Sequence, residues 1–97
     1  MNPLLVKVSR KSKTKELIET AVSILADKGQ VVILGCEETI TKAITVAEII
    51  KRLQPLEQKT QIYRKEFNYM CNDNEVTEKK SCIEIILSNV TQTDMIL

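Results

Sequence analysis

Five positively charged side chains lie close together near the start of the chain. They occupy positions 7–15, a stretch without acidic residues: Lys7, Arg10, Lys11, Lys13 and Lys15. Such clusters bind phosphate, which gives affinity and salt dependence but little sequence information. The formal net charge is only +1, but phosphate binding depends on local clustering rather than on the total. The alternative is an ordinary solvated loop. We favour a binding role, centred on Arg10, Lys11 and Lys13.

The residue types required by most catalytic and metal sites are missing. The sequence has no histidine, and its three cysteines are widely spaced without a CxxC pair. These facts exclude a Cys/His zinc site and a histidine-based catalytic dyad, and there is no glycine-rich phosphate loop. We therefore expect no enzymatic activity and no cofactor.

The cysteines also bear on the cellular compartment. Their odd number, together with the lack of a signal peptide, favours free thiols in a reducing compartment. Cys71 and Cys82 flank a predicted hairpin loop and could face each other in a reversible disulfide, but we favour the reduced state. No apolar run approaches the ~20 residues needed to span a bilayer. We expect a cytoplasmic or nuclear location and no membrane partner.

Strand and helix signals alternate in the first half of the chain. A β-branched run predicts a strand over 4–8, and helical spacing of apolar residues predicts a helix over 13–28. Ser12 or Thr14 can cap the start of this helix, and Gly29 suits its end.

A second strand and helix follow. The apolar run 31–34 predicts a buried strand, after which Gly35 is expected to turn the chain. A second helix is predicted over 38–53, ending before Pro55.

The last part of the chain predicts a long β-hairpin. Strands are expected over 59–70 and 81–88, joined by about ten residues that include the turn cluster Asn72-Asp73-Asn74. Residues 89–97 are expected to form a frayed tail. The sequence thus predicts a single α+β domain over 1–97 with a core at about 4–88. Its architecture would be a two-layer α/β sandwich of order β-α-β-α-β-β.

The second helix carries more apolar surface than one sheet requires. One stripe lies at Ile40, Ala43, Ile44, Ala47 and Ile50. A second stripe of Val46, Ile49 and Leu53 lies beside it. The first helix could cover the second stripe within one subunit. We favour a second subunit, which makes these three residues the predicted dimer interface.

Three segments resemble the Alba family of DNA- and RNA-binding proteins. They are VKVSRKS at 6–12, VVILG at 31–35 with TITKAI at 39–44, and VAEIIKR at 46–52. The closing CIEIIL at 82–87 also resembles the last strand of the family. The resemblance implies a dimer that binds nucleic acid through a basic surface across both subunits and two hairpin arms. A eukaryotic branch supplies paired subunits of ribonuclease P and its relatives.

The resemblance assigns roles to further lysines. It places Arg10 and Lys11 at the basic pair of the family, and Lys79 and Lys80 at the base of the hairpin arm, where three acidic residues offset much of their charge. Lys42 lies beside the second helical stripe, so two copies could face each other near a dimer axis around an anion. The alternative is a lysine at the rim.

One segment departs from the family. Where its members often have a basic RGR turn, this chain has Cys36-Glu37-Glu38, whose carboxylates repel phosphate.

The few aromatic side chains have two interpretations. Tyr63, Phe67 and Tyr69 fall on one parity of the predicted third strand, with Lys65 between them. They could stack on bases. We favour the alternative, that they form the packed face of the strand.

These observations predict a dimeric protein that binds DNA or RNA mainly through the backbone, with low sequence specificity, as in chromatin. The alternative is a heterodimeric scaffold subunit of a ribonucleoprotein such as ribonuclease P/MRP, with little binding of its own. Its partner would be another Alba-like chain.

Overall fold

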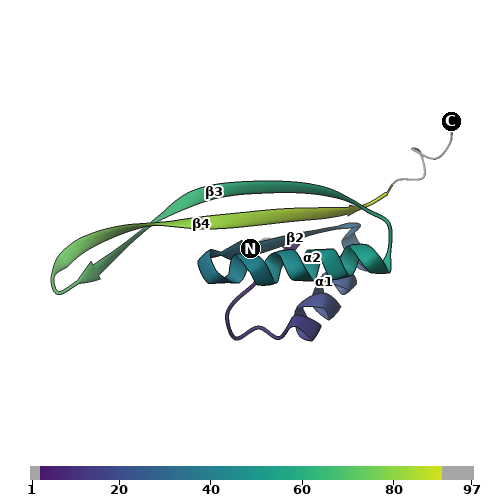
Figure 1. Cartoon of the computed structure of the whole chain (residues 1–97), viewed down its shortest axis with the longest axis horizontal. Coiled ribbons are helices and arrows are strands. Elements are labelled where there is room, and N and C mark those ends of the chain that lie inside the picture. The colour runs from purple at the N-terminus through teal and green to yellow at the C-terminus, as the bar shows by residue number, and fades with distance from the viewer. Residues whose placement is uncertain (1–2, 91–97) are drawn as a thin grey trace.

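The computed structural model describes residues 3–90, and its elements follow the predicted order. They are β1 (Leu5–Lys7), α1 (Thr14–Lys28), β2 (Gln30–Cys36), the one-turn 3-10 helix η1 (Glu37–Thr39), α2 (Ile40–Leu53), β3 (Leu56–Cys71) and β4 (Asn74–Asn89). The strands form one sheet in the order β1-β2-β4-β3, in which only β1 and β2 are parallel. Both helices cover the same face (Figure 1), so the two-layer α+β sandwich is confirmed. Within residues 3–90, neither helix has the length and apolarity to cross a bilayer.

The hydrophobic core lies between the two helices and the sheet. Its strand residues come from β1, β2 and the C-terminal half of β4, where alternate side chains point to the helices: Val6, Val31, Ile33, Ile83, Ile85 and Leu87. Val8, which follows β1, also belongs to the core. From β3, only Leu56 packs against this core. Beyond the helices the β3–β4 hairpin continues as a free arm (Figure 1), which gives the molecule a length of 61 Å.

Helix α1 forms as its apolar spacing predicts. Leu17, Ala21 and Leu25 recur every four residues and are buried. The helix ends at Gly29, whose φ of 77° is left-handed and whose N–H donates to the Leu25 carbonyl at 2.8 Å, as predicted. The predicted N-cap was wrong. Lys13 holds that position without a side-chain cap, because the Ser12 hydroxyl is used inside the preceding loop.

Gly35 lies inside β2, which corrects the prediction that it turns the chain. It pairs with Ile83 of β4, and the strand continues to Cys36. A Cβ atom on Gly35 would lie 2.8 Å from both the Ala43 Cβ and the Thr39 carbonyl oxygen. Glycine is required here because the start of α2 packs directly on the strand.

The hairpin connection is a tight turn, not the predicted loop of about ten residues. Cys71 pairs with Asn74, so only Asn72 and Asp73 lie between the strands. Both have positive φ, 52° and 64°, as a type I′ turn requires. The last strand, β4, also extends further at its C-terminal end than predicted. Asn89 pairs with Leu56 rather than starting a tail, and 91–97 lie outside the described residues.

The predicted dimer stripe on α2 is wrong at Val46. Val46 is 0% exposed because the core-facing side of α2 consists of Ala43, Val46, Ala47 and Ile50. Ile49 is half-buried and Leu53 is 63% exposed, so these two stay predictions. Ile44, which was expected in the core stripe, is 42% exposed.

Candidate nucleic-acid interface

The loop between β1 and α1 is tied into a fixed turn. The Val8 N–H donates to the Leu34 carbonyl at 2.8 Å, which anchors the start of the loop to β2. The Ser12 N–H donates to the Ser9 carbonyl at 3.2 Å, and the Ser9 N–H donates to the Ser12 hydroxyl at 3.1 Å. Arg10 and Lys11 therefore lie at the tip of an ordered turn with their side chains exposed.

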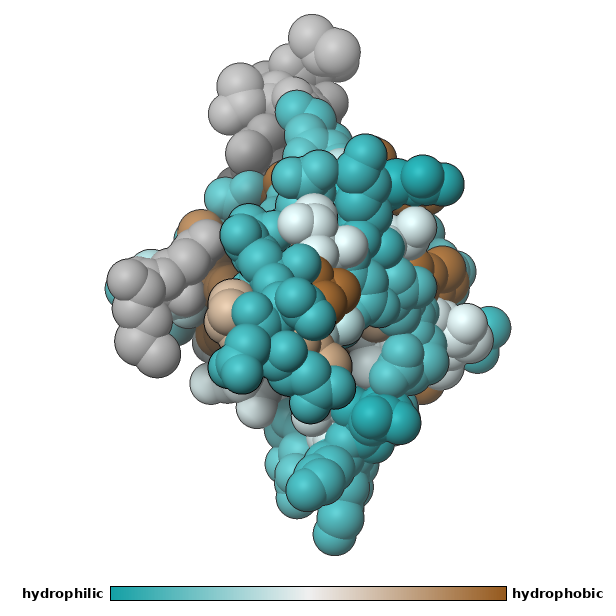
Figure 2. Space-filling model, turned by 90° about the vertical axis from the view of Figure 1, so that its left-hand side faces the viewer, coloured by the Kyte–Doolittle hydropathy of each residue, from teal (hydrophilic) through white to brown (hydrophobic). Residues whose placement is uncertain are grey.

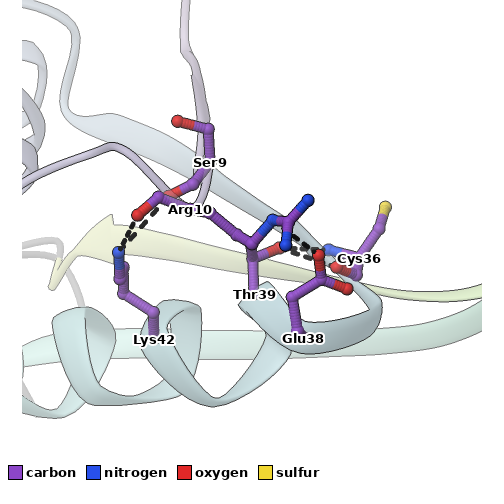
Figure 3. Close-up of polar contacts among 6 residues, drawn as sticks. All are labelled: Ser9, Arg10, Cys36, Glu38, Thr39 and Lys42. Carbon is purple, nitrogen blue, oxygen red and sulfur yellow. Dashed lines mark hydrogen bonds and ion pairs between the residues drawn. The ribbon is translucent and has the colours of Figure 1, made fainter.

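Lys42 of α2 holds this turn from below. Its Nζ donates to the carbonyl oxygens of Ser9 at 3.3 Å and Arg10 at 3.1 Å (Figure 3). It also donates to the carbonyl oxygen of Ser12 at 2.9 Å. An ammonium group has three donors, and all three point at the loop. Lys42 thus positions the residues predicted to contact phosphate. The proximity of two Lys42 copies at a dimer axis stays a prediction.

The predicted contact residues differ in whether an acidic side chain compensates their charge. The Nε of Arg10 lies 3.0 Å from a carboxylate oxygen of Glu38 (Figure 3), and both side chains are more than half exposed. Lys11 and Lys13 are exposed and have no ion-pair partner within residues 3–90. Lys11 and Lys13 therefore offer the strongest attraction for phosphate, while Arg10 is partly compensated.

The acidic turn before α2 is held by hydrogen bonds to two neighbouring strands, β2 and β4. Thr39, which is buried, accepts from the Cys36 N–H and donates to the Cys36 carbonyl, each at 2.8 Å. Glu37 has a φ of 53°, and its carboxylate accepts from the Ser81 N–H at 3.1 Å. The left-handed backbone at Glu37 is a conformation that glycine adopts more readily than residues with a side chain.

The structure pairs the cysteines differently from the prediction. Cys36 and Cys82 are directly opposite in the β2–β4 ladder and form a disulfide. Cys71 is exposed and free, and it pairs with Asn74 near the hairpin tip, far along β4 from Cys82. The possible Cys71–Cys82 contact is therefore excluded, because the hairpin turn is shorter than expected and the register brings Cys36 to Cys82. The prediction of reduced thiols was wrong for Cys36 and Cys82 and holds for Cys71.

The two hairpin lysines do not form one site. Successive residues of a strand point to opposite faces, so Lys79 and Lys80 diverge. Lys79 lies 3.9 Å from Glu66 across the hairpin, with both side chains exposed. Lys80 lies on the outer face of the sheet, opposite Lys65. They lie at the base of the free arm, as predicted, because the pairing of β4 with β2 ends at Cys82 and the hairpin continues from there to its turn.

The aromatic residues do not pack under the helices, which corrects the favoured interpretation. Tyr63 pairs with Cys82, and the next residue, Ile83, faces the helices. Because side chains alternate along a strand, Cys82 and its partner Tyr63 lie on the outer face, as does Phe67. Both are half-buried. The Tyr63 hydroxyl donates to Glu84 at 3.2 Å. Burial raises the pKa of the Tyr63 phenol, and the negative charge of Glu84 raises it further.

Sequence reasoning missed the grouping on this outer face. Lys7, Lys65 and Lys80 come from β1, β3 and β4, yet they line one pocket together with Phe67. The sequence predicts which residues of a strand share a face, but it does not predict the order of the strands in the sheet. In the described part of the chain, no three acidic or cysteine side chains gather closely enough to hold a metal ion.

Comparisons with known proteins agree with this architecture. The structure superimposes on the crystal structure of ALBA1 from Trypanosoma brucei with a TM-score of 0.73 and 18% identity, covering 98% of this chain and 76% of that one. It matches Alba from Thermoplasma volcanium with a TM-score of 0.69 and 23% identity, covering 88% and 99%. At these identities the likeness shows the fold. No curated protein matches significantly. The Alba family model, however, matches residues 5–66, so the chain belongs to the Alba family.

Proposed function

We propose that this protein binds DNA or RNA as a dimer, through the sugar–phosphate backbone and with low sequence specificity. Alba proteins are in general nucleic-acid-binding proteins, and the family model covers most of the chain. The observation that carries the proposal is the β1–α1 loop, where Lys11 and Lys13 are exposed on a turn fixed by Lys42. A preformed cationic turn binds phosphate without a further ordering penalty.

The dimer would form through the flank of α2 that is opposite to Lys42, which replaces the prediction that two Lys42 copies face each other near the dimer axis. Ile44 lies on that flank and is 42% exposed. On β3, Ile62 pairs with the buried Ile83, so it faces the helix side, yet it is 75% exposed. At the hairpin end of the molecule, small apolar patches lie within a largely hydrophilic surface (Figure 2). Two large aliphatic side chains exposed on α2 and on the helix side of β3 favour a second copy of the chain, which the family resemblance also implies.

The proposal is tested by a filter-binding titration against duplex DNA and structured RNA over a salt series. We expect micromolar affinity at low ionic strength, with log K falling linearly as log salt rises. The combined Lys11→Gln and Lys13→Gln variant should reduce the slope by about one to two charges. The matched control is Lys59→Gln, which removes an exposed charge from β3. The absence of binding at low salt would refute the function.

Two observations favour a second function, that of a scaffold subunit paired with a different Alba-like chain. The Arg10–Glu38 ion pair and the net charge of +1 reduce the attraction for phosphate. Sedimentation of the purified chain separates the two functions. A stable homodimer with its own affinity for nucleic acid supports the first. A monomer that binds nucleic acid only after an Alba-like partner is added supports the second.

A further inference from the structure

A pocket of about 250 Å³ opens on the outer face of the sheet, on the side that the helices do not cover. Lys7, Lys65 and Lys80 lie around it, and Phe67 forms part of its wall. The Cys36–Cys82 disulfide fixes β2 to β4 beside it. The pocket is smaller than the roughly 300–1,000 Å³ typical of sites for drug-sized ligands, so a ligand about the size of one nucleobase suits it better.

The charge of the pocket favours an anion. Its two carboxylates are already engaged: Glu37 accepts the Ser81 N–H at 3.1 Å, and Glu38 pairs with Arg10 at 3.0 Å. By contrast, its three lysines have no ion-pair partner within residues 3–90. Around the pocket, the uncompensated charge is therefore positive.

Two of these cations lie over the ring of Phe67. The Nζ of Lys65 is 5.7 Å from the centroid of the ring, and the Nζ of Lys80 is 5.3 Å from it. Lys65 and Lys80 are also directly opposite in the β3–β4 ladder, where like charges destabilise the pair. An anion between them would relieve this repulsion. The half-exposed ring beside them offers a face on which a flat aromatic group can stack.

We infer that this pocket binds one unpaired base of a single-stranded nucleic acid. The base stacks on Phe67, and its phosphate lies between Lys65 and Lys80. Either long lysine side chain can turn from the ring to the phosphate as the base enters. A paired base is stacked on both faces within a duplex and cannot enter, so the site discriminates single strands from duplexes. This inference rests on the proposed function and adds a second, separate contact surface to the β1–α1 loop.

The test measures the affinity of a short fluorescein-labelled oligoadenylate and of a blunt RNA duplex by anisotropy. Phe67→Leu retains the apolar packing but removes the stacking face. We expect it to weaken oligoadenylate binding by about tenfold, within the range for one lost base stack, and to leave duplex binding within about twofold. Phe67→Tyr should restore the affinity. Lys65→Gln should weaken oligoadenylate binding by a smaller factor.

The matched control is Lys59→Gln, which removes an exposed lysine from the same strand and face, away from the pocket. It should weaken oligoadenylate binding only as much as the loss of any one exposed positive charge does. If Phe67→Leu leaves oligoadenylate binding unchanged while the wild type still binds duplex, the pocket inference is overturned and the proposed function stands. If the wild type binds neither probe at low salt, the proposed function itself fails.

Discussion

The Nζ of Lys42, in the first turn of α2, donates a hydrogen bond of 2.9 Å to the carbonyl oxygen of Ser12, which lies 30 residues earlier. Two further bonds from the same ammonium reach the carbonyls of Ser9 and Arg10. One cation thus joins the loop that carries the basic patch to the helix proposed to flank the dimer interface.

The first prediction concerns this contact. Lys42→Met should lower the free energy of unfolding by about 1–3 kcal/mol, because three carbonyls lose a charged donor. It should also weaken phosphate binding, since the loop is no longer fixed. Urea denaturation and amide exchange at Ser12 measure the two effects. The control is Lys51→Met, which breaks only the exposed Glu48 pair and should change stability by less than about 1 kcal/mol. Equal effects of the two variants would contradict a positioning role.

A second prediction follows from the Arg10–Glu38 ion pair. Glu38→Gln removes the carboxylate that lies 3.0 Å from Arg10 and releases the guanidinium toward phosphate. Because exposed pairs are worth about 0.2–1 kcal/mol, nucleic-acid affinity should rise by a factor of about 1.4 to 5. A salt-series titration should show a steeper slope. Glu19→Gln, at an exposed residue of α1 without an ion pair among residues 3–90, serves as the control and should leave the slope unchanged.

The disulfide gives a third prediction. Cys36 and Cys82 close a loop with a sequence separation of 46, so reduction or Cys36→Ser should destabilise the fold by about 2–4 kcal/mol. Urea denaturation with and without dithiothreitol measures the difference. Cys71→Ser should have no effect, because that thiol is exposed and unpaired among the described residues. An unchanged midpoint under reducing conditions would show that the two thiols are not bonded in solution.

A fourth prediction addresses the close approach of α2 to β2. Gly35→Ala places a methyl group 2.8 Å from both the Ala43 Cβ and the Thr39 carbonyl oxygen, and neither is the end of a flexible side chain. Either α2 or β2 must shift, at a cost of about 1–3 kcal/mol in thermal or urea unfolding. Gly29→Ala introduces no contact closer than 3.7 Å and should cost only about 1 kcal/mol through its left-handed backbone. A smaller loss at Gly35 than at Gly29 would contradict the packing argument.

Elements with one buried face were predictable from sequence. Helix α1 and the end of β4 carry apolar residues at the period of their own geometry, and Gly29 marks the end of the helix. The β3 half of the hairpin was predicted, but the register and the turn of the free arm were not, because neither face of the arm is buried under the helices and its sequence shows no alternation of apolar and polar residues. The turn at Asn72-Asp73 was therefore read as part of a long loop.

The candidate site also has one part that the sequence predicts and another that it does not. The basic loop is local in sequence, so Arg10, Lys11 and Lys13 were found from spacing alone. The disulfide and the outer pocket depend on which strands are neighbours. Cys36 meets Cys82, and Lys7 shares a pocket with Lys80, only in the order β1-β2-β4-β3. The burial of Val46 likewise depends on the angle at which α2 meets the sheet, which periodicity does not give.

The last prediction tests the dimer. Ile62→Lys and Ile44→Lys each place a charge in the proposed apolar contact, and an unpaired buried charge costs about 3–5 kcal/mol. The dimer dissociation constant should therefore rise by at least about 100-fold, which sedimentation measures. Met70→Lys is the control, because Met70 is similarly exposed, at 67%, but lies near the hairpin tip. A wild-type protein that stays monomeric at every concentration would contradict homodimer formation. Dimers unaffected by both isoleucine variants would place the interface elsewhere, with the half-buried Ile49 and the exposed Leu53 as the next residues to change.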